Sequence, residues 1–224
     1  AKQKGSLVLL DACQSLAHQK LDVRDMGIDF LAGSGHKLCG PTGIGFLWSK
    51  EEILEKIPPF FGGGEMIQDV FEDRSTWAEL PHKFEAGTPA IAEAIGLAEA
   101  IKYISNVGLD CIKEYEKHIT EYLFDQLSQI DDLEIIGPTP KIDPNRASLA
   151  TFYVKGIHSN DIAEILDSKG VCIRSGHHCC QPLHRHIGIN ATARVSMNFT
   201  TSQEEINIFI EKLKETISFL IQNS

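Results

Sequence analysis

The chain of 224 residues is long enough to bury a core in one large domain or two modest ones. Its 42% hydrophobic and 23% charged residues are ordinary for a globular protein and argue against intrinsic disorder. A net charge of −10 argues against a nucleic-acid-binding protein and disfavours anionic membranes. No apolar stretch approaches the roughly 18 residues of a membrane span, so we expect no membrane partner.

Six cysteines are scattered without regular spacing, and a chain of this size does not need a disulfide framework. We therefore expect reduced thiols and a reducing compartment. No signal peptide is visible and the first residues do not resemble a native start, which leaves a longer precursor open. The cysteines are Cys13, Cys39, Cys111, Cys172, Cys179 and Cys180.

Short apolar runs ending in polar residues open the chain. Residues 6–10 precede Asp11, and residues 30–32 precede a Gly-rich segment that reaches Lys37. Residues 44–48 predict a third strand after a Gly/Pro turn. Strands that alternate with connecting segments predict an α/β sheet, and ligands of such sheets bind outside the carboxyl ends of the strands. Asp11 and Lys37 are both expected at such ends.

Two long helices are predicted after a Pro/Gly-rich loop at residues 58–64. Residues 89–106 and 109–130 both place apolar side chains at three- and four-residue spacing, and Gly108 ends the first of them. We place a domain boundary here. Residues 1–100 are expected to belong to a larger domain with a mostly parallel sheet, and residues 101–224 to a smaller α+β domain.

The second half is predicted to alternate short strands and helices. Ser159 is expected to cap a helix, and Ser202 with Glu205 makes a capping-box pattern for the last one. Cys172 lies in a short apolar run and is expected to be a buried structural cysteine. The predicted strands are residues 149–154, 171–173 and 194–199, the last with Arg194, Ser196 and Asn198 on one face.

The segment around Lys37 carries the first chemical signal. Small residues before a lysine let the backbone approach a bulky ligand, and a lysine amine can form a Schiff base with an aldehyde cofactor. Asp11 supplies a carboxylate for a protonated pyridine nitrogen, as pyridoxal phosphate (PLP) requires. Either residue alone is more commonly a surface lysine or a turn-forming aspartate. Asp11 and Lys37 together, in this order, are a more specific signal for a PLP site.

Four motifs resemble one family. Residues 34–45, Ser-Gly-His-Lys-Leu-Cys-Gly-Pro-Thr-Gly-Ile-Gly, look like the lysine motif of fold-type I PLP enzymes in the cysteine desulfurase branch. Gly-Gly-Gly-Glu-Met-Ile at 62–67, Phe-Glu-Ala-Gly-Thr-Pro at 84–89 and Arg-Ser-Gly-His-His-Cys at 174–179 are similar to motifs of the SUF-type, or class II, desulfurases. The resemblance covers nearly the whole chain.

The resemblance implies a cofactor role for five residues near the start of the chain. Lys37 would bind PLP covalently and shuttle protons, with His36 also at the catalytic centre. Asp11 would pair with the pyridine nitrogen and Gln14 with the phenolic oxygen. Ser34 and His36 would bind the phosphate. The family's phosphate-binding turn and the histidine that stacks on the cofactor come before Asp11 in the family and are not in this chain.

The remaining implied roles belong to residues further along. Gly87 and Thr88 would reach the phosphate in the partner subunit's site, which requires a homodimer. Arg194, with Arg174, would bind the carboxylate of the substrate, although a surface salt bridge is the alternative for Arg194. Cys179 would accept the sulfur.

The segment around Cys179 also invites a metal interpretation. Two adjacent histidines and two adjacent cysteines, with His184 and His186 nearby, carry ligand types that zinc prefers. Their spacing fits a zinc site poorly, so no metal ligand is assigned. A nucleophilic thiolate fits better, because Arg174 and the histidines favour the thiolate form. Cys180 stands where the class II pattern more often has alanine.

The function implied is that of a PLP-dependent cysteine desulfurase that converts L-cysteine to L-alanine. A persulfide on Cys179 would supply sulfur, through an acceptor protein of the SUF system, for iron–sulfur cluster assembly. The compartment would be the cytoplasm of a bacterium or a plastid-type organelle of a eukaryote. A selenocysteine lyase, a more distant aminotransferase-like protein, and a non-catalytic or metal-binding fragment remain alternatives.

Overall fold

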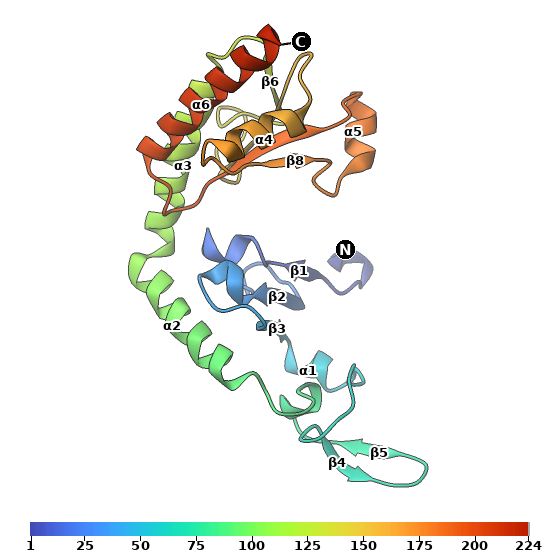
Figure 1. Cartoon of the computed structure of the whole chain (residues 1–224). Helices are drawn as coiled ribbons and strands as arrows, with labels where there is room; N and C mark the ends of the chain where they lie inside the picture. The colour runs from blue at the N-terminus through green and yellow to red at the C-terminus, as the bar shows by residue number, and fades with distance from the viewer. Residues whose placement is uncertain (224) are drawn as a thin grey trace. The chain divides into compact units, whose positions relative to one another are not determined.

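The computed structural model describes residues 1–223, and the chain divides into two units that each contain a sheet (Figure 1). The first unit is Ala1–Cys111 and the second is Ile112–Ser224. This division falls inside a long helix, whereas the boundary predicted at residue 100 falls inside the helix before it. No helix within the described residues is long and apolar enough to cross a membrane.

The first unit holds mostly short elements. Its strands are β1 (Leu9–Asp11), β2 (Phe30–Ser34), β3 (Gly45–Ser49), β4 (Ile67–Val70) and β5 (Ser75–Trp77). Its helices are α1 (Glu51–Leu54), α2 (Ile91–Val107) and the 3-10 turns η1 (Lys2–Lys4), η2 (Ser15–Ala17), η3 (Gly35–Leu38) and η4 (His82–Phe84). Helix α3 (Leu109–Leu127) crosses from this unit into the second.

The first sheet has the strand order β1-β2-β3. Strands β1 and β2 pair in parallel, with Asp11 opposite Ala32, and the carboxyl ends of both strands reach the same edge. Strand β3 pairs antiparallel to β2, so the expectation of a mostly parallel sheet holds only for the first pair of these three strands. The connection from β2 to β3 is too short for the crossover that a parallel pair needs.

A buried carboxylate ties the segments around this sheet together. Asp29 is 2% exposed and forms ion pairs with Lys2 and, at 2.9 Å, with Lys50. It also accepts a hydrogen bond of 2.8 Å from the Val8 backbone N–H. The hydrogen bonds from Lys2 and Lys50 hold the pKa of Asp29 well below its usual range. One side chain therefore anchors the residues before β1 and after β3 to the start of β2.

The second unit packs helices on a four-stranded antiparallel sheet of order β6-β7-β9-β8. One apolar core joins β7 and β9 to α3, α4 and α6. The elements after α3 are β6 (Leu133–Ile136), β7 (Leu149–Val154), α4 (Ser159–Ser168), β8 (Arg174–Gly176), α5 (Gln181–Ile187), β9 (Thr192–Ser196) and α6 (Gln203–Gln222).

The sequence patterns of α6 and β7 are confirmed. Helix α6 begins with a capping box in which Ser202 and Glu205 bond each other's backbone N–H groups. Its stripe of Ile206, Phe209 and Leu213 is buried in the core. In β7 buried and half-buried side chains alternate, as the period of two along a strand requires.

Four local predictions in the second unit are wrong. Residues 171–173 form no strand, and Cys172 is exposed, with its thiol 3.3 Å from the Asp167 carboxylate. The N-cap of α4 is His158, whose Nδ1 accepts from the Asn160 N–H, while Ser159 donates to the Ala191 carbonyl instead. Strand β9 ends before Asn198.

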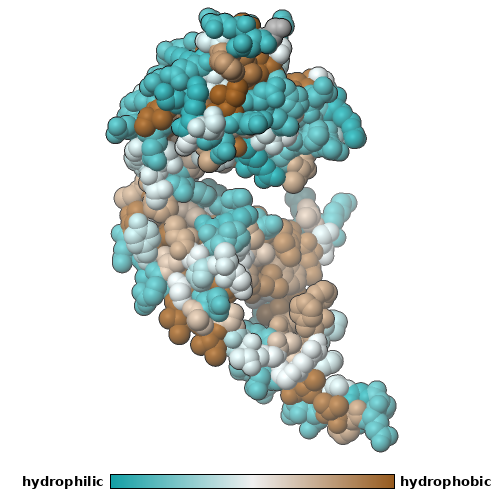
Figure 2. All heavy atoms as spheres, in the orientation of Figure 1, coloured by the Kyte–Doolittle hydropathy of each residue, from teal (hydrophilic) through white to brown (hydrophobic). Residues whose placement is uncertain are grey.

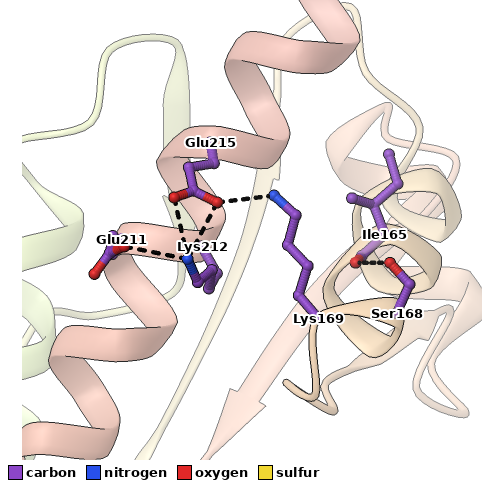
Figure 3. Close-up of polar contacts among 6 residues, drawn as sticks. All are labelled: Ile165, Ser168, Lys169, Glu211, Lys212 and Glu215. Atoms are coloured by element: carbon purple, nitrogen blue, oxygen red, sulfur yellow. Dashed lines mark hydrogen bonds and ion pairs between the residues drawn. The ribbon is translucent and has the colours of Figure 1, made fainter.

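Ion pairs join the surface of α4 to α6 (Figure 3). Lys169, after the end of α4, lies 3.0 Å from Glu215, and Lys212 bridges Glu215 and Glu211 at 3.1 Å each. Exposed pairs contribute only about 0–1 kcal/mol each. The position of α6 therefore depends mainly on its buried apolar stripe.

Large apolar side chains remain exposed on the first unit and contribute to the brown areas of its surface (Figure 2). Phe60 is 88% exposed and Phe61 is 68% exposed in the loop before β4. Helix α2 exposes a further apolar group that includes Ile91, Ile95 and Tyr103. Apolar side chains gathered in this way are common at interaction surfaces.

We predict that Leu213→Ala lowers the unfolding free energy by about 2–5 kcal/mol, because it leaves a cavity in the core of the second unit. Leu213 is 0% exposed on α6. The matched control is Ile208→Ala on the same helix, at a position that is 44% exposed. It should change the free energy by about 0.5 kcal/mol or less. Urea unfolding measures both, and equal losses would contradict the packing described here.

Candidate functional site

Lys37 lies in the turn η3 directly after β2, where its side chain is half-buried. The turn needs glycine on both sides of Ser34, because neighbouring atoms leave no room there for a Cβ. A Cβ at Gly33 would lie 2.5 Å from the Phe46 ring, and one at Gly35 would lie 2.9 Å from the Ile44 carbonyl oxygen. A larger residue at Gly35 would collide with the backbone at Ile44, and one at Gly33 would displace the Phe46 ring, so both glycines allow the close packing from which the lysine turn begins.

Asp11 ends β1 with an exposed carboxylate rather than a buried one. The Cys13 backbone N–H donates to it at 3.0 Å, and the Cys13 thiol, which donates to the Ala32 carbonyl at 3.9 Å, also interacts with it. These bonds, helped by the positive charge of Lys37, lower the pKa of Asp11. The same interaction raises the pKa of the Cys13 thiol. The carboxylate therefore stays ionised at neutral pH, and Gln14 follows it on the surface.

Two polar side chains flank the lysine turn. The Ser34 hydroxyl lies 3.0 Å from Nδ1 of the exposed His36, so the last residue of β2 and the second residue of η3 form a pair. Ser34, His36 and Lys37 thus follow one another on a single turn. This turn and the Asp11 carboxylate lie at the same edge of the sheet, as the sequence predicts.

Gly87 and Thr88 lie in the irregular segment before α2. Gly87 has φ +79°, which favours glycine, and its N–H donates to the Gly64 carbonyl at 2.9 Å. Just upstream, buried Lys83 donates to the Leu54 and Glu55 carbonyls at 3.1 Å each. The segment is therefore fixed to the end of α1 and to the Gly-rich loop, and Thr88 is exposed.

Cys179 lies on a tight turn of the second unit, between β8 and α5. His178 and Cys179 have φ of +49° and +61°, and the Cys180 N–H closes the turn on the His177 carbonyl at 2.9 Å. Two non-glycine residues in this region cost backbone energy, a feature that clusters at functional sites. The turn leaves Cys179 exposed, in an open pocket of about 520 Å³ that Arg174 also lines.

Two histidines secure this turn to a single residue of β9. Thr192, which is fully buried, places its hydroxyl 3.0 Å from Nε2 of buried His184, and its carbonyl accepts from Nε2 of His178 at 3.1 Å. On the other side of its ring, Nδ1 of His184 lies 3.1 Å from the Cys180 carbonyl. Burial lowers the pKa of His178, with help from the charges of Arg194 and Arg174, so its ring is neutral.

The two predicted arginines are neighbours. Arg174 of β8 lies directly opposite Arg194 of β9, and Nε of Arg194 donates to the Ser196 hydroxyl at 3.2 Å. Neither guanidinium forms an ion pair within the described residues, so the salt-bridge alternative for Arg194 is not seen there. Adjacent guanidinium groups without acidic partners are suited to binding a carboxylate.

The sequence reading missed the residues that support these groups. Cys13 and Thr192 carry hydrogen bonds to the candidate site that no motif indicates, and His184 is expected only as one of several histidines near Cys179. For His184 a signal exists, since it lies four residues after Cys180 and so one helical turn away. Within residues 1–223 no group of three or more His, Cys, Asp or Glu side chains is placed to hold a metal ion. All six cysteines are free.

Comparison with known sequences matches residues 1–209 to the aminotransferase class-V family model. The chain is 54% identical over 219 residues to a probable cysteine desulfurase of Synechocystis sp., covering 98% of this chain and 52% of that protein. It is 46% identical over 217 residues to a probable cysteine desulfurase of Staphylococcus aureus, covering 97% and 52%. The chain therefore spans about half the length of the curated relatives it matches.

Solved structures share the fold. A cysteine desulfurase from Thermococcus onnurineus aligns with a TM-score of 0.90 at 38% identity, over 97% of this chain and 54% of that one. The cysteine desulfurase CsdA of Escherichia coli, solved as an S-sulfonic acid, aligns with a TM-score of 0.90 at 31% identity, over 98% and 53%. The predicted α/β fold class is confirmed.

We predict that His178 makes stability depend on pH. Because its pKa is lowered in the folded chain, the unfolded state binds a proton more readily. The contribution of neutral His178 to the free energy of unfolding is complete above the unfolded pKa of about 6.5. It is lost as pH falls from there toward the pKa of the folded chain. His178→Gln should therefore show a smaller loss of unfolding free energy between about pH 7.5 and pH 5.5 than the unmodified chain.

The matched control is His177→Gln, because His177 is the exposed neighbour on the same turn. Its pH dependence, measured by urea unfolding at both pH values, should follow the unmodified chain. An identical response of the two variants would show that burial of His178 does not set the pH dependence.

Proposed function

Because the chain belongs to the aminotransferase class-V family, we propose that it is part of a PLP-dependent cysteine desulfurase of the SUF type. The enzyme converts L-cysteine to L-alanine and leaves the sulfur on Cys179. One observation carries the proposal beyond the family: an exposed thiol at the tip of a strained turn, in a pocket shared with Arg174. An aminotransferase-like function gives that thiol no role.

The residues of the first unit fit PLP by the chemistry of their donor set. A half-buried amine at Lys37 suits the cofactor aldehyde, and the ionised Asp11 carboxylate suits a protonated pyridine nitrogen. The paired side chains of Ser34 and His36 suit its phosphate. When bound, PLP supplies an electron sink for the bonds at the α-carbon of an amino acid.

These residues would divide the work of holding the cofactor. Lys37 would hold the cofactor aldehyde and would be placed to move a proton, with His36 next to it in the turn. Asp11 would keep the pyridine nitrogen protonated, and the interaction with Cys13 lowers the pKa of Asp11. Gln14 would donate to the phenolic oxygen.

The second unit supplies the residues that bind the substrate and accept its sulfur. Arg194, with Arg174 opposite it on the neighbouring strand, binds the substrate carboxylate. The Cys179 thiolate attacks the sulfur of the bound cysteine. A sulfur–sulfur bond forms as the carbon–sulfur bond breaks, and the carbon takes a proton to leave alanine.

The assembly we propose is a homodimer in which Gly87 and Thr88 of one subunit reach the phosphate of the other. The exposed apolar side chains of α2 and of the Phe60–Phe61 loop support this proposal, because such surface is suited to contact with a second polypeptide. A SUF-system acceptor protein takes the sulfur for iron–sulfur cluster assembly. The compartment is the cytoplasm in a bacterium or a plastid-type organelle in a eukaryote.

We predict that Lys37→Ala abolishes the covalent attachment of PLP, because it removes the amine that binds the aldehyde. Borohydride reduction followed by mass spectrometry should tag Lys37 in the unmodified full-length protein and should tag no residue in the variant. The matched control is Lys50→Ala, since Lys50 pairs with Asp29 away from the η3 turn. A borohydride tag that persists in Lys37→Ala would refute the lysine assignment.

We predict that Cys179→Ser reduces alanine formation from L-cysteine by about 100-fold or more, because a hydroxyl does not replace a thiolate nucleophile. Cofactor binding should survive, since Cys179 lies in the second unit. Cys172→Ser is the matched control, because Cys172 is also exposed and lies seven positions earlier. Alanine release by Cys179→Ser at the rate of the control would exclude Cys179 as the sulfur acceptor.

A further inference from the structure

A second thiol lies directly after the proposed sulfur acceptor, in different surroundings. Cys180 is half-buried, and its Sγ donates to the His177 carbonyl at 3.0 Å. The same sulfur lies 3.9 Å from Nδ1 of buried His184. Cys179, in contrast, is exposed, and its thiol has no hydrogen-bond partner among residues 1–223. One turn therefore presents an open thiol and a sheltered thiol side by side.

We propose that Cys180 is a second sulfur-accepting thiol, which takes the outer sulfur atom of the Cys179 persulfide. This inference rests on the proposed desulfurase function. In the step, the Cys180 thiolate attacks the outer sulfur, which keeps its hydrogen. A sulfur–sulfur bond forms at Cys180 as the bond to Cys179 breaks, and Cys179 leaves as a thiolate. Atoms, electrons and charge balance without an added oxidant or reductant.

Backbone spacing favours attack on the outer sulfur over attack on the inner one. Attack on the inner sulfur would close a disulfide between adjacent residues, whose Cα atoms are only about 3.8 Å apart. Unstrained disulfides need a Cα separation of roughly 4.4–6.8 Å. The outer sulfur lies one bond of about 2 Å beyond Cys179 Sγ, and its capture closes no ring between the two residues.

His184 is placed to serve this transfer as a positioning residue. Its ring is fixed on one side by the Thr192 hydroxyl and on the other by the Cys180 carbonyl. Nδ1–H, which donates to the Cys180 carbonyl, is therefore held 3.9 Å from Cys180 Sγ, where it favours the thiolate that the attack requires. The transferred sulfur would then be half-buried, and Cys179 would be free for another substrate molecule.

The test uses the full-length holoenzyme with excess L-cysteine, sampled over time, alkylated and digested with trypsin. Both thiols fall in the peptide of residues 175–185, and fragmentation between them assigns each sulfur. We expect sulfur first on Cys179 and later on Cys180, approaching two extra sulfur atoms per chain. Cys180→Ser and Cys180→Ala should carry half that load, Cys172→Ser the full load and Cys179→Ser none. Retained yellow colour confirms that each variant is folded.

The inference is overturned if Cys180 never carries sulfur, or if both Cys180 variants load as much as the unmodified enzyme. A Cys179–Cys180 disulfide formed with release of sulfide would also overturn it. These failures are distinct from failure of the proposed function. If the unmodified enzyme forms alanine and a Cys179 persulfide but no Cys180 persulfide, only this inference is lost. If it forms no persulfide, the proposed function is lost too.

Discussion

The close approach of backbone to backbone around η3 is the constraint on which the first unit's chemistry depends. Gly35 lies against the Ile44 carbonyl and Gly45 against the Gly33 carbonyl, and β2 and β3 remain paired right up to the turn. The lysine side chain therefore starts from a rigid point, and Asp11 ends the neighbouring parallel strand. Side chains on rigid elements hold their geometry better than side chains on loops.

Features encoded by local sequence were predictable. The strand that ends at Asp11, the two long helices and the Ser202–Glu205 capping box each depend on residues close together in the chain, and the structure confirms them. Lys37 was placed correctly at the end of a strand for the same reason. The assignment of chemical roles to these residues came from motif resemblance rather than from their spacing.

Features set by distant residues were not predictable. The apolar run at 171–173 looks like a strand, but pairing with β9 begins only at Arg174. His158 caps α4 while Ser159 bonds the Ala191 carbonyl, 32 positions away, which no local pattern reveals. The cysteine turn requires positive φ at His178 and Cys179, which glycine usually supplies, and contacts from Thr192 and His184 hold it in that conformation.

The hydroxyl of Thr192 bonds His184 and its carbonyl bonds His178, so one residue of β9 limits how the turn that carries Cys179 can vary among related chains. Residues 174–190 do not form a module that can be exchanged alone, because their two histidines find their partners on one residue of a different strand. A chimera that imports the turn without its matching β9 would inherit the cysteines but lose their orientation. Evolutionary change at positions 184 and 192, whose side chains bond each other, should therefore be correlated.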